Sequence, residues 1–300
     1  MTQAENDVLK ESLQFQSGGK QCSATLYRPP AVERPPVVVM AHGFGGTQDA
    51  RLPAYAEYFC GLGIAALTFD YRHFGLSQGE PRQLLDIREQ LEDWRAAIAF
   101  ARRLPQVDGN RVAIWGTSFS GGHVLTIAAE DAGLRAVVAQ VPFTDGLAHL
   151  EPSLHSVRLA MRGLLDKGKS LLGLAPETIG VVGPPGSMAA MTTPDAEPGY
   201  LRLVDGLPDW SNEVAARIAL ELPLYRPIKQ VKRIKAPVLY VIATQDVVTP
   251  VKPALEACRL TPRHEMITFE GGHFDPYVAP VFDTVAQPQG VFLSKYLLNE

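Results

Sequence analysis

Residues 111–122 read Arg-Val-Ala-Ile-Trp-Gly-Thr-Ser-Phe-Ser-Gly-Gly, and they are the most informative part of the chain for its fold. Its first part, residues 111–115, is a short apolar run of the kind that forms a buried strand. A helical pattern follows at residues 123–132. A sharp turn between such a strand and helix lifts the serine at its centre above the sheet. The stretch therefore makes Ser118 a candidate nucleophile.

The same alternation of strand and helix extends in both directions from this turn. Residues 8–28 read as two short strands around Ser17-Gly18-Gly19-Lys20, which is a turn signal. Further apolar runs of strand length lie at residues 37–41, 64–69, 136–141, 238–243 and 265–269. Helical patterns lie at residues 52–62, 84–103, 253–260 and 281–298. Alternation of this kind predicts an α/β fold with a mostly parallel sheet of about eight strands and helices on both faces.

The alternation stops between residues 144 and 230. Two helical segments are expected there, at about 154–172 and 212–222, and no buried strand is recognisable. Proline and glycine at residues 183–186 and Thr193-Pro194-Asp195 prevent a continuous helix. We therefore predict that residues 1–143 and 231–300 form the core and that residues 144–230 form a helical cap. The apolar residues of the first cap helix suit either a substrate or docking on the sheet.

The composition excludes several classes of protein. The chain has 300 residues and a formal net charge of −4, which argues against a nucleic-acid partner. The first ten residues carry no apolar signal region, and no apolar run is long enough to span a bilayer, so a cytoplasmic protein without a membrane partner is expected. Three scattered cysteines and seven histidines without metal-site spacing predict neither disulfides nor a metal. Gly61-Leu62-Gly63 precedes a strand, the wrong context for a dinucleotide, and no cofactor is expected.

A serine hydroxyl needs a base to take its proton and a carboxylate to orient that base. His273, in Glu270-Gly271-Gly272-His273-Phe274, follows the last predicted strand and is the best candidate base. Asp246 follows the strand at residues 238–243 and is the best candidate acid. Asp145 and, less plausibly, Asp275 are alternatives. The chain order Ser, Asp, His is the order expected for this type of sheet.

An oxyanion needs preorganised donors, and two backbone amides are candidates. One is the amide of Phe119, the residue after the serine, and the other is the amide of Phe44 in His42-Gly43-Phe44-Gly45-Gly46. His42 is interpreted as a structural residue that fixes this loop, and His123 as a residue packed in its helix. Ser120 stands where the G-x-S-x-G pattern prefers glycine, so Ser120 as the nucleophile in a shifted register is the alternative to Ser118.

The chain resembles the α/β-hydrolase superfamily over essentially its whole length. The residues that carry the resemblance are the 42–46 loop, Asp70-Tyr71-Arg72-His73-Phe74-Gly75-Leu76-Ser77, the turn at Ser118, Asp246 and His273. The 70–77 loop is similar to the family pattern D-x-R-G-x-G-x-S, except that His73 replaces a glycine. The resemblance implies a Ser-His-Asp triad and a lid inserted after the sixth strand. The nearest groups are the dienelactone-hydrolase-like and S15-peptidase-like esterases.

The expected activity is hydrolysis of carboxylic esters of small to medium, apolar substrates through an acyl-enzyme. A thioesterase, an amidase or an acyltransferase would use the same residues. A hydrolase-fold protein that binds a ligand without catalysis is the alternative from another class. The expected partner is a small-molecule acyl substrate, and a homo-oligomer is left open.

Overall fold

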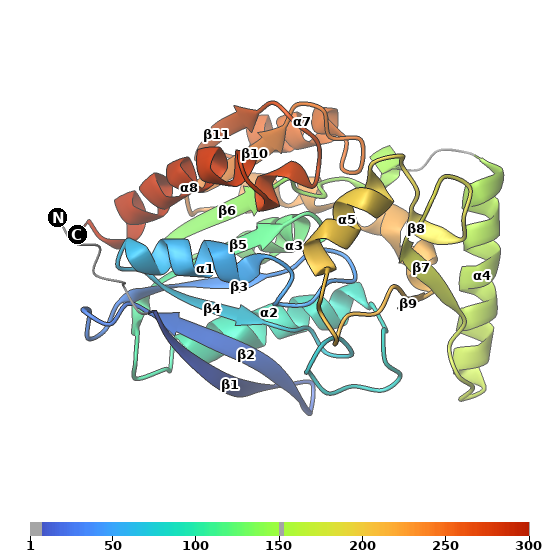
Figure 1. Cartoon of the computed structure of the whole chain (residues 1–300), viewed down its shortest axis with the longest axis horizontal. Helices are drawn as coiled ribbons and strands as arrows, with labels where there is room; N and C mark the ends of the chain where they lie inside the picture. The colour runs from blue at the N-terminus through green and yellow to red at the C-terminus, as the bar shows by residue number, and fades with distance from the viewer. Residues whose placement is uncertain (1–7, 150–152, 300) are drawn as a thin grey trace.

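The computed structural model describes residues 8–149 and 153–299, and its centre is an eight-stranded sheet (Figure 1). The strand order is β1-β2-β4-β3-β5-β6-β10-β11. The bounds are β1 Leu9–Ser17, β2 Lys20–Arg28, β3 Pro36–Ala41, β4 Ala65–Phe69, β5 Asp108–Thr117, β6 Ala136–Gln140, β10 Val238–Ala243 and β11 His264–Phe269. Strand β2 pairs antiparallel with both of its neighbours, and the other pairs are parallel. The predicted α/β-hydrolase architecture is confirmed.

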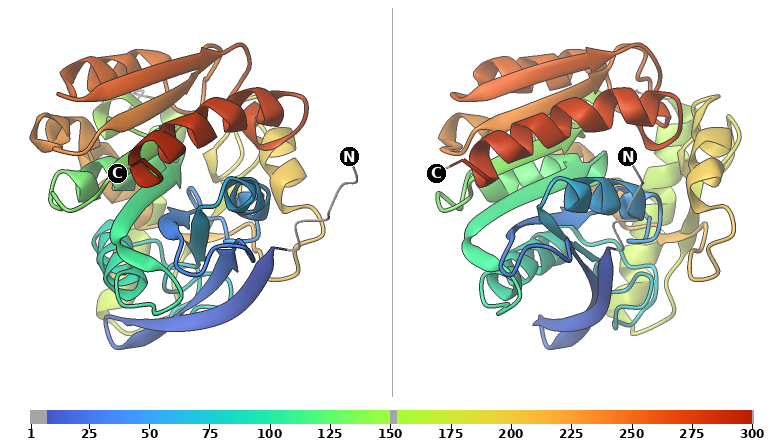
Figure 2. Two further views of the ribbon diagram at one scale, coloured as in Figure 1. Left: turned by 90° about the vertical axis from the view of Figure 1, so that its left-hand side faces the viewer. Right: turned by 60° about the vertical axis from the view of Figure 1, so that its left-hand side comes forward.

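Helices cover both faces of this sheet, because its central strands are apolar on both sides. Every residue of β3, β4, β6 and β10 is buried. Helices α1 and α8 pack together on one face, and α2 and α3 pack together on the other (Figure 2). The helix bounds are α1 Leu52–Gly61, α2 Ile87–Ala101, α3 Phe119–Ala128, α7 Val251–Leu260 and α8 Val281–Leu297.

Helix α3 begins earlier than the sequence predicts, at Phe119 rather than near residue 123. All ten of its residues are buried. Gly121 and Gly122 allow this position, because a Cβ on Gly121 would lie 2.8 Å from Pro142 Cα and one on Gly122 would lie 2.2 Å from the Phe143 carbonyl oxygen. The two glycines thus let the helix start directly at the turn after Ser118.

The segment 144–230 differs from the predicted all-helical cap. It contains a three-stranded sheet in the order β8-β7-β9. Its bounds are α4 Leu154–Leu171, β7 Thr178–Val182, β8 Ala189–Met191, α5 Ala196–Val204, β9 Val214–Ala215 and α6 Ile218–Glu221. The helix expected at residues 154–172 is confirmed as α4, whereas β9 and the four-residue α6 replace the helix expected at 212–222. The strands are too short for their sequence pattern to predict them.

Three further features concern the class of protein. Within residues 8–149 and 153–299, no helix is long and apolar enough to cross a membrane. In the same ranges, no group of three or more histidine, cysteine or acidic residues could hold a metal ion. The cysteines Cys22, Cys60 and Cys258 are free and buried, so they are small residues of the core.

Candidate active site

Ser118 sits at the turn between β5 and α3 in a backbone conformation that side chains rarely adopt, with φ of 57° and ψ of −119°. Its neighbours must be small. A Cβ on Gly116 would lie 2.3 Å from the Ser120 carbonyl oxygen, and a Cβ on Gly43 would lie 2.9 Å from Ser118 Cβ. The local sequence therefore produces a tight turn that presents the serine at the carboxyl end of β5.

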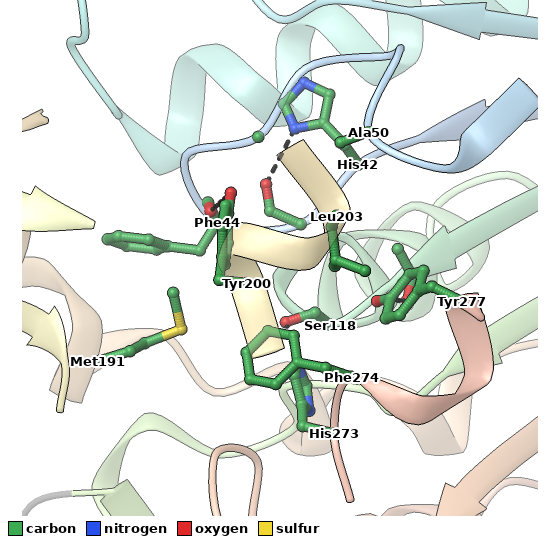
Figure 3. A pocket seen from close by; sticks show the side chains of 13 residues that line it. His42, Phe44, Ala50, Ser118, Met191, Tyr200, Leu203, His273, Phe274 and Tyr277 are labelled. Atoms are coloured by element: carbon green, nitrogen blue, oxygen red, sulfur yellow. Dashed lines mark hydrogen bonds between the residues drawn. The ribbon is translucent and has the colours of Figure 1, made fainter. Parts of the chain in front are cut away.

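The structure brings Ser118, His273 and Asp246 together from three different loops. Ser118 Oγ lies 2.9 Å from His273 Nε2, and His273 Nδ1 lies 2.7 Å from Asp246 Oδ2. Figure 3 shows the Ser118 and His273 side chains side by side in the pocket. His273 is 1% exposed and Asp246 is 7% exposed. The carboxylate holds the proton of the imidazole on Nδ1, which leaves Nε2 free to accept the serine proton.

The Asp246 carboxylate is fixed by the chain that follows it. Its Oδ1 accepts hydrogen bonds from the amides of Val248 (2.9 Å) and Thr249 (2.7 Å). The Thr249 hydroxyl lies 2.8 Å from Asp246 Oδ2 and 3.2 Å from His273 Nδ1. Sequence reasoning missed Thr249, although Asp246-Val247-Val248-Thr249 has the spacing of a turn in which an aspartate caps the amide three residues later.

The two alternative acids are engaged elsewhere. Asp145 forms a two-pronged ion pair with Arg226, with N–O distances of 2.7 and 2.8 Å. Asp275 accepts a hydrogen bond of 2.7 Å from the amide of Gly272. Because Asp246 is the carboxylate that contacts His273, it is the acid of the candidate site.

Ser120 has a structural environment. Its side chain is fully buried, and its hydroxyl lies 2.9 Å from the hydroxyl of Tyr71, which also accepts a 2.8 Å hydrogen bond from Trp94 Nε1. The serine in place of the usual glycine thus ties the turn to the 70–77 loop. This contact leaves Ser118 as the serine that reaches His273.

The two candidate oxyanion donors come from the 42–46 loop and from the first residue of α3. Within the described ranges, neither the amide of Phe44 nor that of Phe119 donates a hydrogen bond to another group of the chain. Their rings pack edge to face with centroids 5.6 Å apart. Phe44 lines the cavity beside Ser118, whereas Phe74 is a core residue with 1% exposure.

The cavity at Ser118 is small, about 30 Å³, which is room for one or two water molecules. Residues of the core and of the segment 144–230 line it together (Figure 3). The core contributes His42, Gly43, Phe44, Gly46, Ala50, Thr117, Ser118, His273, Phe274 and Tyr277, and the segment contributes Met191, Tyr200 and Leu203. The segment 144–230 therefore covers the candidate site.

Two aromatic residues of this segment hold the 42–46 loop. The Tyr200 hydroxyl donates a 2.8 Å hydrogen bond to the carbonyl of Phe44, and Trp210 Nε1 donates a 3.0 Å hydrogen bond to the carbonyl of Gly45. The Val181 side chain of β7 packs so closely on Gly45 that a Cβ there would lie 2.6 Å from it. No sequence motif indicated these contacts, because they join residues more than 130 positions apart.

His42 and His123 are predicted to be structural residues, and the rings of both contact other groups of the chain. His42 Nδ1 lies 2.9 Å from the Gly43 carbonyl, and burial lowers the pKa of His42 to about 4. His123 contacts Tyr225 and Gln90, and burial lowers its pKa to about 3. Both rings are therefore uncharged near neutral pH, so neither supplies a positive charge to the site.

The contacts of His73 explain how a histidine can replace the glycine of the family pattern in the 70–77 loop. The φ of His73 is 72°, a value that normally favours glycine. Contacts of His73 Nδ1 with the Pro81 carbonyl (2.8 Å) and of His73 Nε2 with Glu89 (2.9 Å) hold it there. Asp70 accepts hydrogen bonds from the amides of Gln48 and Leu76, and burial raises its pKa to about 6.

Comparisons with known proteins agree with this fold. The chain is 47% identical to the quorum-quenching protein AidA of Acinetobacter baumannii over 286 residues, which cover 94% of each chain. It is 35% identical to the polyketide transferase grgF of a Penicillium species over 159 residues, 53% of each. The crystal structure of GrgF from Penicillium sp. sh18 superposes with a TM-score of 0.83 at 24% identity, covering 97% of this chain and 100% of that one.

The family model described as X-Pro dipeptidyl-peptidase (S15 family) matches residues 18–170, which contain the 42–46 loop, the 70–77 loop and the turn at Ser118. The match covers half of the chain, and the AidA similarity extends over nearly all of it. The chain belongs to the α/β-hydrolase superfamily and, within it, to the S15 family.

Proposed function

We propose that this protein is a serine hydrolase that cleaves carboxylic esters of small to medium, apolar substrates through an acyl-enzyme. The observation that carries the proposal is the continuous hydrogen-bonded chain from Ser118 through His273 to Asp246, at the bottom of a covered cavity. A hydroxyl activated in this way attacks acyl carbon atoms. The proposal assigns Ser118, His273 and Asp246 as the catalytic residues.

In the proposed reaction, Ser118 Oγ attacks the acyl carbon as His273 Nε2 takes its proton. The amides of Phe44 and Phe119 donate hydrogen bonds to the oxyanion that forms. The imidazolium then protonates the leaving alcohol, and the acyl group remains on Ser118. Water, deprotonated by His273, attacks this acyl-enzyme and releases the carboxylic acid. Asp246 stabilises the imidazolium in both halves of the reaction.

The lining of the cavity supports an apolar substrate. Met191, Leu203 and Phe274 face it, beside Ser118 and His273. The cavity of about 30 Å³ is smaller than an acyl chain, and we propose that the segment 144–230 shifts when substrate binds. AidA is described as quorum-quenching. If this chain shares that role, its substrate is a signalling molecule with a scissile acyl bond.

Acyl transfer or thioester cleavage is the second candidate. Relatives include a polyketide transferase and a thiohydrolase from Eupenicillium brefeldianum, the latter 28% identical over 272 residues. The same triad serves both reactions, and the second nucleophile decides the outcome. Matched oxygen and sulfur esters distinguish the leaving groups, and products that depend on an added alcohol or amine would identify a transferase.

The direct test is intact-mass analysis after treatment with a fluorophosphonate probe. We expect one adduct in the wild type, one adduct in Ser120→Ala and none in Ser118→Ala. Ser120→Ala is the matched control, because it removes the neighbouring hydroxyl at the same turn. An adduct that persists in Ser118→Ala would contradict the assignment of the nucleophile. No adduct on any variant would favour the non-catalytic binding protein.

A second prediction concerns the residues that hold the 42–46 loop. Tyr200→Phe removes the hydrogen bond to the Phe44 carbonyl and keeps the ring in place. This hydrogen bond positions the loop that carries an oxyanion donor, and a net hydrogen bond contributes about 1 kcal/mol. If that energy is lost from the transition state, kcat should fall by about fivefold to tenfold. KM should change less than kcat, because the donor acts mainly in the transition state. Trp210→Phe tests the Gly45 contact in the same way.

The control for these variants is Tyr296→Phe, which removes an exposed hydroxyl on α8 far from the loop. Steady-state kinetics on one chromogenic ester would provide both kcat and KM. Unchanged kcat in both loop variants would show that the loop keeps its position without these hydrogen bonds.

A further inference from the structure

Helix α4 carries a stripe of large apolar side chains that remain exposed, because no other part of the described chain covers them. The six residues of this stripe, which we call the α4 stripe, are between 51% and 82% exposed. They are Leu154, Val157, Met161, Leu164, Leu165 and Leu171. Figure 1 shows α4 standing at the outer edge of the molecule. Contiguous exposed apolar surface of this kind marks an interaction site.

The helix is attached to the protein by its other side. Gly163 faces α6, where a Cβ would lie 2.9 Å from the Leu220 side chain. Asp166 is fully buried and accepts hydrogen bonds from the Arg217 side chain at 2.6 and 2.9 Å. A buried ion pair and a tight glycine contact fix the rotation of α4 about its axis. The stripe is therefore held away from the body of the protein.

The spacing of the stripe is that of a helix that pairs with another helix. Five residues of the stripe and Gly168 occupy positions 154, 157, 161, 164, 168 and 171, which alternate in steps of three and four residues, and Leu165 lies beside them. This heptad repeat keeps the apolar residues on one side of a helix and seats them between the residues of a facing helix. Gly168 occupies one of these positions, and a Cβ there would meet nothing within 4 Å. The spacing of these residues therefore suits a facing helix, and no helix of the described chain occupies that place.

A second copy of α4 fits this stripe when the two helices run antiparallel. With a two-fold axis between Met161 and Leu164, these two residues face each other, and Leu154 faces Leu171. The same axis places Val157, a branched residue, opposite Gly168, which leaves room for it. The pattern of the stripe is thus self-complementary, as a two-fold interface requires.

The charges beside the stripe are compatible with this pairing. Arg158 and Lys167 lie on opposite flanks of the stripe, at the e and g heptad positions. In an antiparallel pair, e positions adjoin e positions and g positions adjoin g positions, so Arg158 lies beside Leu165 of the other copy and Lys167 lies beside Ala160. The like charges do not face each other. Helix α4 contains no tryptophan, tyrosine or phenylalanine, the residues that often anchor an interfacial helix in lipid.

We propose that the α4 stripe is the interface of a two-fold homodimer in which the two α4 helices pack antiparallel. Because α4 belongs to the segment that covers Ser118, the interface joins the covering segments of two copies. The proposal does not depend on the proposed reaction, since its test measures mass and geometry rather than turnover.

Light scattering coupled to size-exclusion chromatography tests the interface. The wild type is expected to have the mass of a dimer, and Met161→Glu and Leu164→Glu are expected to have half that mass. Val291→Glu is the matched control, because Val291 is 64% exposed on another helix, α8, and this variant should remain a dimer. Circular dichroism of each variant separates dissociation from unfolding. A wild type that is monomeric at every concentration, or a dimer that both α4 variants leave intact, would overturn the proposal.

Single cysteines test the direction of the helices, because the native cysteines are buried. Met161→Cys should form a disulfide-linked dimer on mild oxidation when it is mixed with Leu164→Cys, because the two-fold axis places these two positions opposite each other. Val157→Cys should form one only when mixed with Gly168→Cys. Linkage of Val157→Cys with itself would indicate parallel helices and overturn the antiparallel geometry. If the protein is instead a monomer that binds phosphatidylserine vesicles, and Met161→Glu and Leu164→Glu abolish this binding, then the stripe contacts a lipid surface and the dimer proposal is wrong.

Discussion

The Asp246→Asn variant is expected to lose about 10⁴-fold in kcat at neutral pH if the proposed reaction is correct. The carboxylate accepts the Nδ1 proton of His273 at 2.7 Å, and this keeps Nε2 unprotonated toward Ser118. An asparagine amide in the same place can donate to Nδ1, which places the imidazole proton on Nε2. The ring then cannot accept the serine proton. It also loses the negative charge that stabilises the imidazolium.

Several features make this variant a sharp test. The Val248 and Thr249 amides bind one carboxylate oxygen, and an asparagine can present its carbonyl to them. The loop should therefore keep its shape, and the loss should be in kcat rather than in folding. The measurement is the pH dependence of kcat for hydrolysis of a chromogenic ester.

The matched control is Asp145→Asn, which changes the alternative acid that pairs with Arg226. Its kcat should stay close to that of the wild type, because Asp145 pairs with Arg226 and not with His273. If Asp145→Asn lost activity and Asp246→Asn kept it, the assignment of the acid would be wrong.

The candidate site was predictable where the chemistry needs a local pattern. A nucleophile on a tight turn requires glycine near it, and Gly116 and Gly121 mark the place of Ser118 in the sequence. His273 and Asp246 each follow an apolar run, and the carboxyl ends of parallel strands meet at one edge of the sheet. The order of the three residues could therefore be read along the chain before their contacts were known.

The surroundings of the site were not predictable in the same way. Tyr200, Trp210 and Val181 act on the 42–46 loop through contacts between distant parts of the chain, which no periodicity reveals. The strands β7, β8 and β9 have five, three and two residues, and their pairing with each other rather than their pattern makes them strands. Residues 212–222 have a helical sequence pattern, but the pairing of β9 with β7 overrides this local preference.

The Arg72→Met variant is expected to lose about 3–5 kcal/mol of unfolding free energy at neutral pH, because it leaves a buried carboxylate without its partner. Asp93 is fully buried, and Arg72 is 4% exposed. Arg72 Nε lies 2.6 Å from Asp93 Oδ1, and the Arg72 amide donates a 3.0 Å hydrogen bond to Oδ2. A methionine keeps much of the volume of the side chain and removes the charge. The measurement is urea unfolding followed by circular dichroism.

The pH dependence separates loss of charge pairing from loss of packing. In the variant, the Asp93 carboxylate is buried without the charge of Arg72. Burial disfavours the ionised carboxylate, so the pKa of Asp93 is higher in the folded state than in the unfolded state. The folded state then binds more protons, and the deficit should shrink as the pH falls. Arg72→Met/Asp93→Leu, which removes both charges, should recover most of the stability. A deficit that is the same at every pH would indicate packing instead.

Arg95→Met is the matched control for this variant. Arg95 pairs with Glu130 at 2.9 Å, but both side chains are more than 40% exposed, so the loss of this ion pair should cost at most about 1 kcal/mol.

The two variants can also be compared in activity, because Arg72 adjoins Tyr71, whose hydroxyl contacts Ser120 in the turn that carries Ser118. If Arg72 holds the 70–77 loop in place, Arg72→Met should lower activity even under conditions where it is fully folded, whereas Arg95→Met should not. Equal stability of the two variants would show that the buried carboxylate finds another partner.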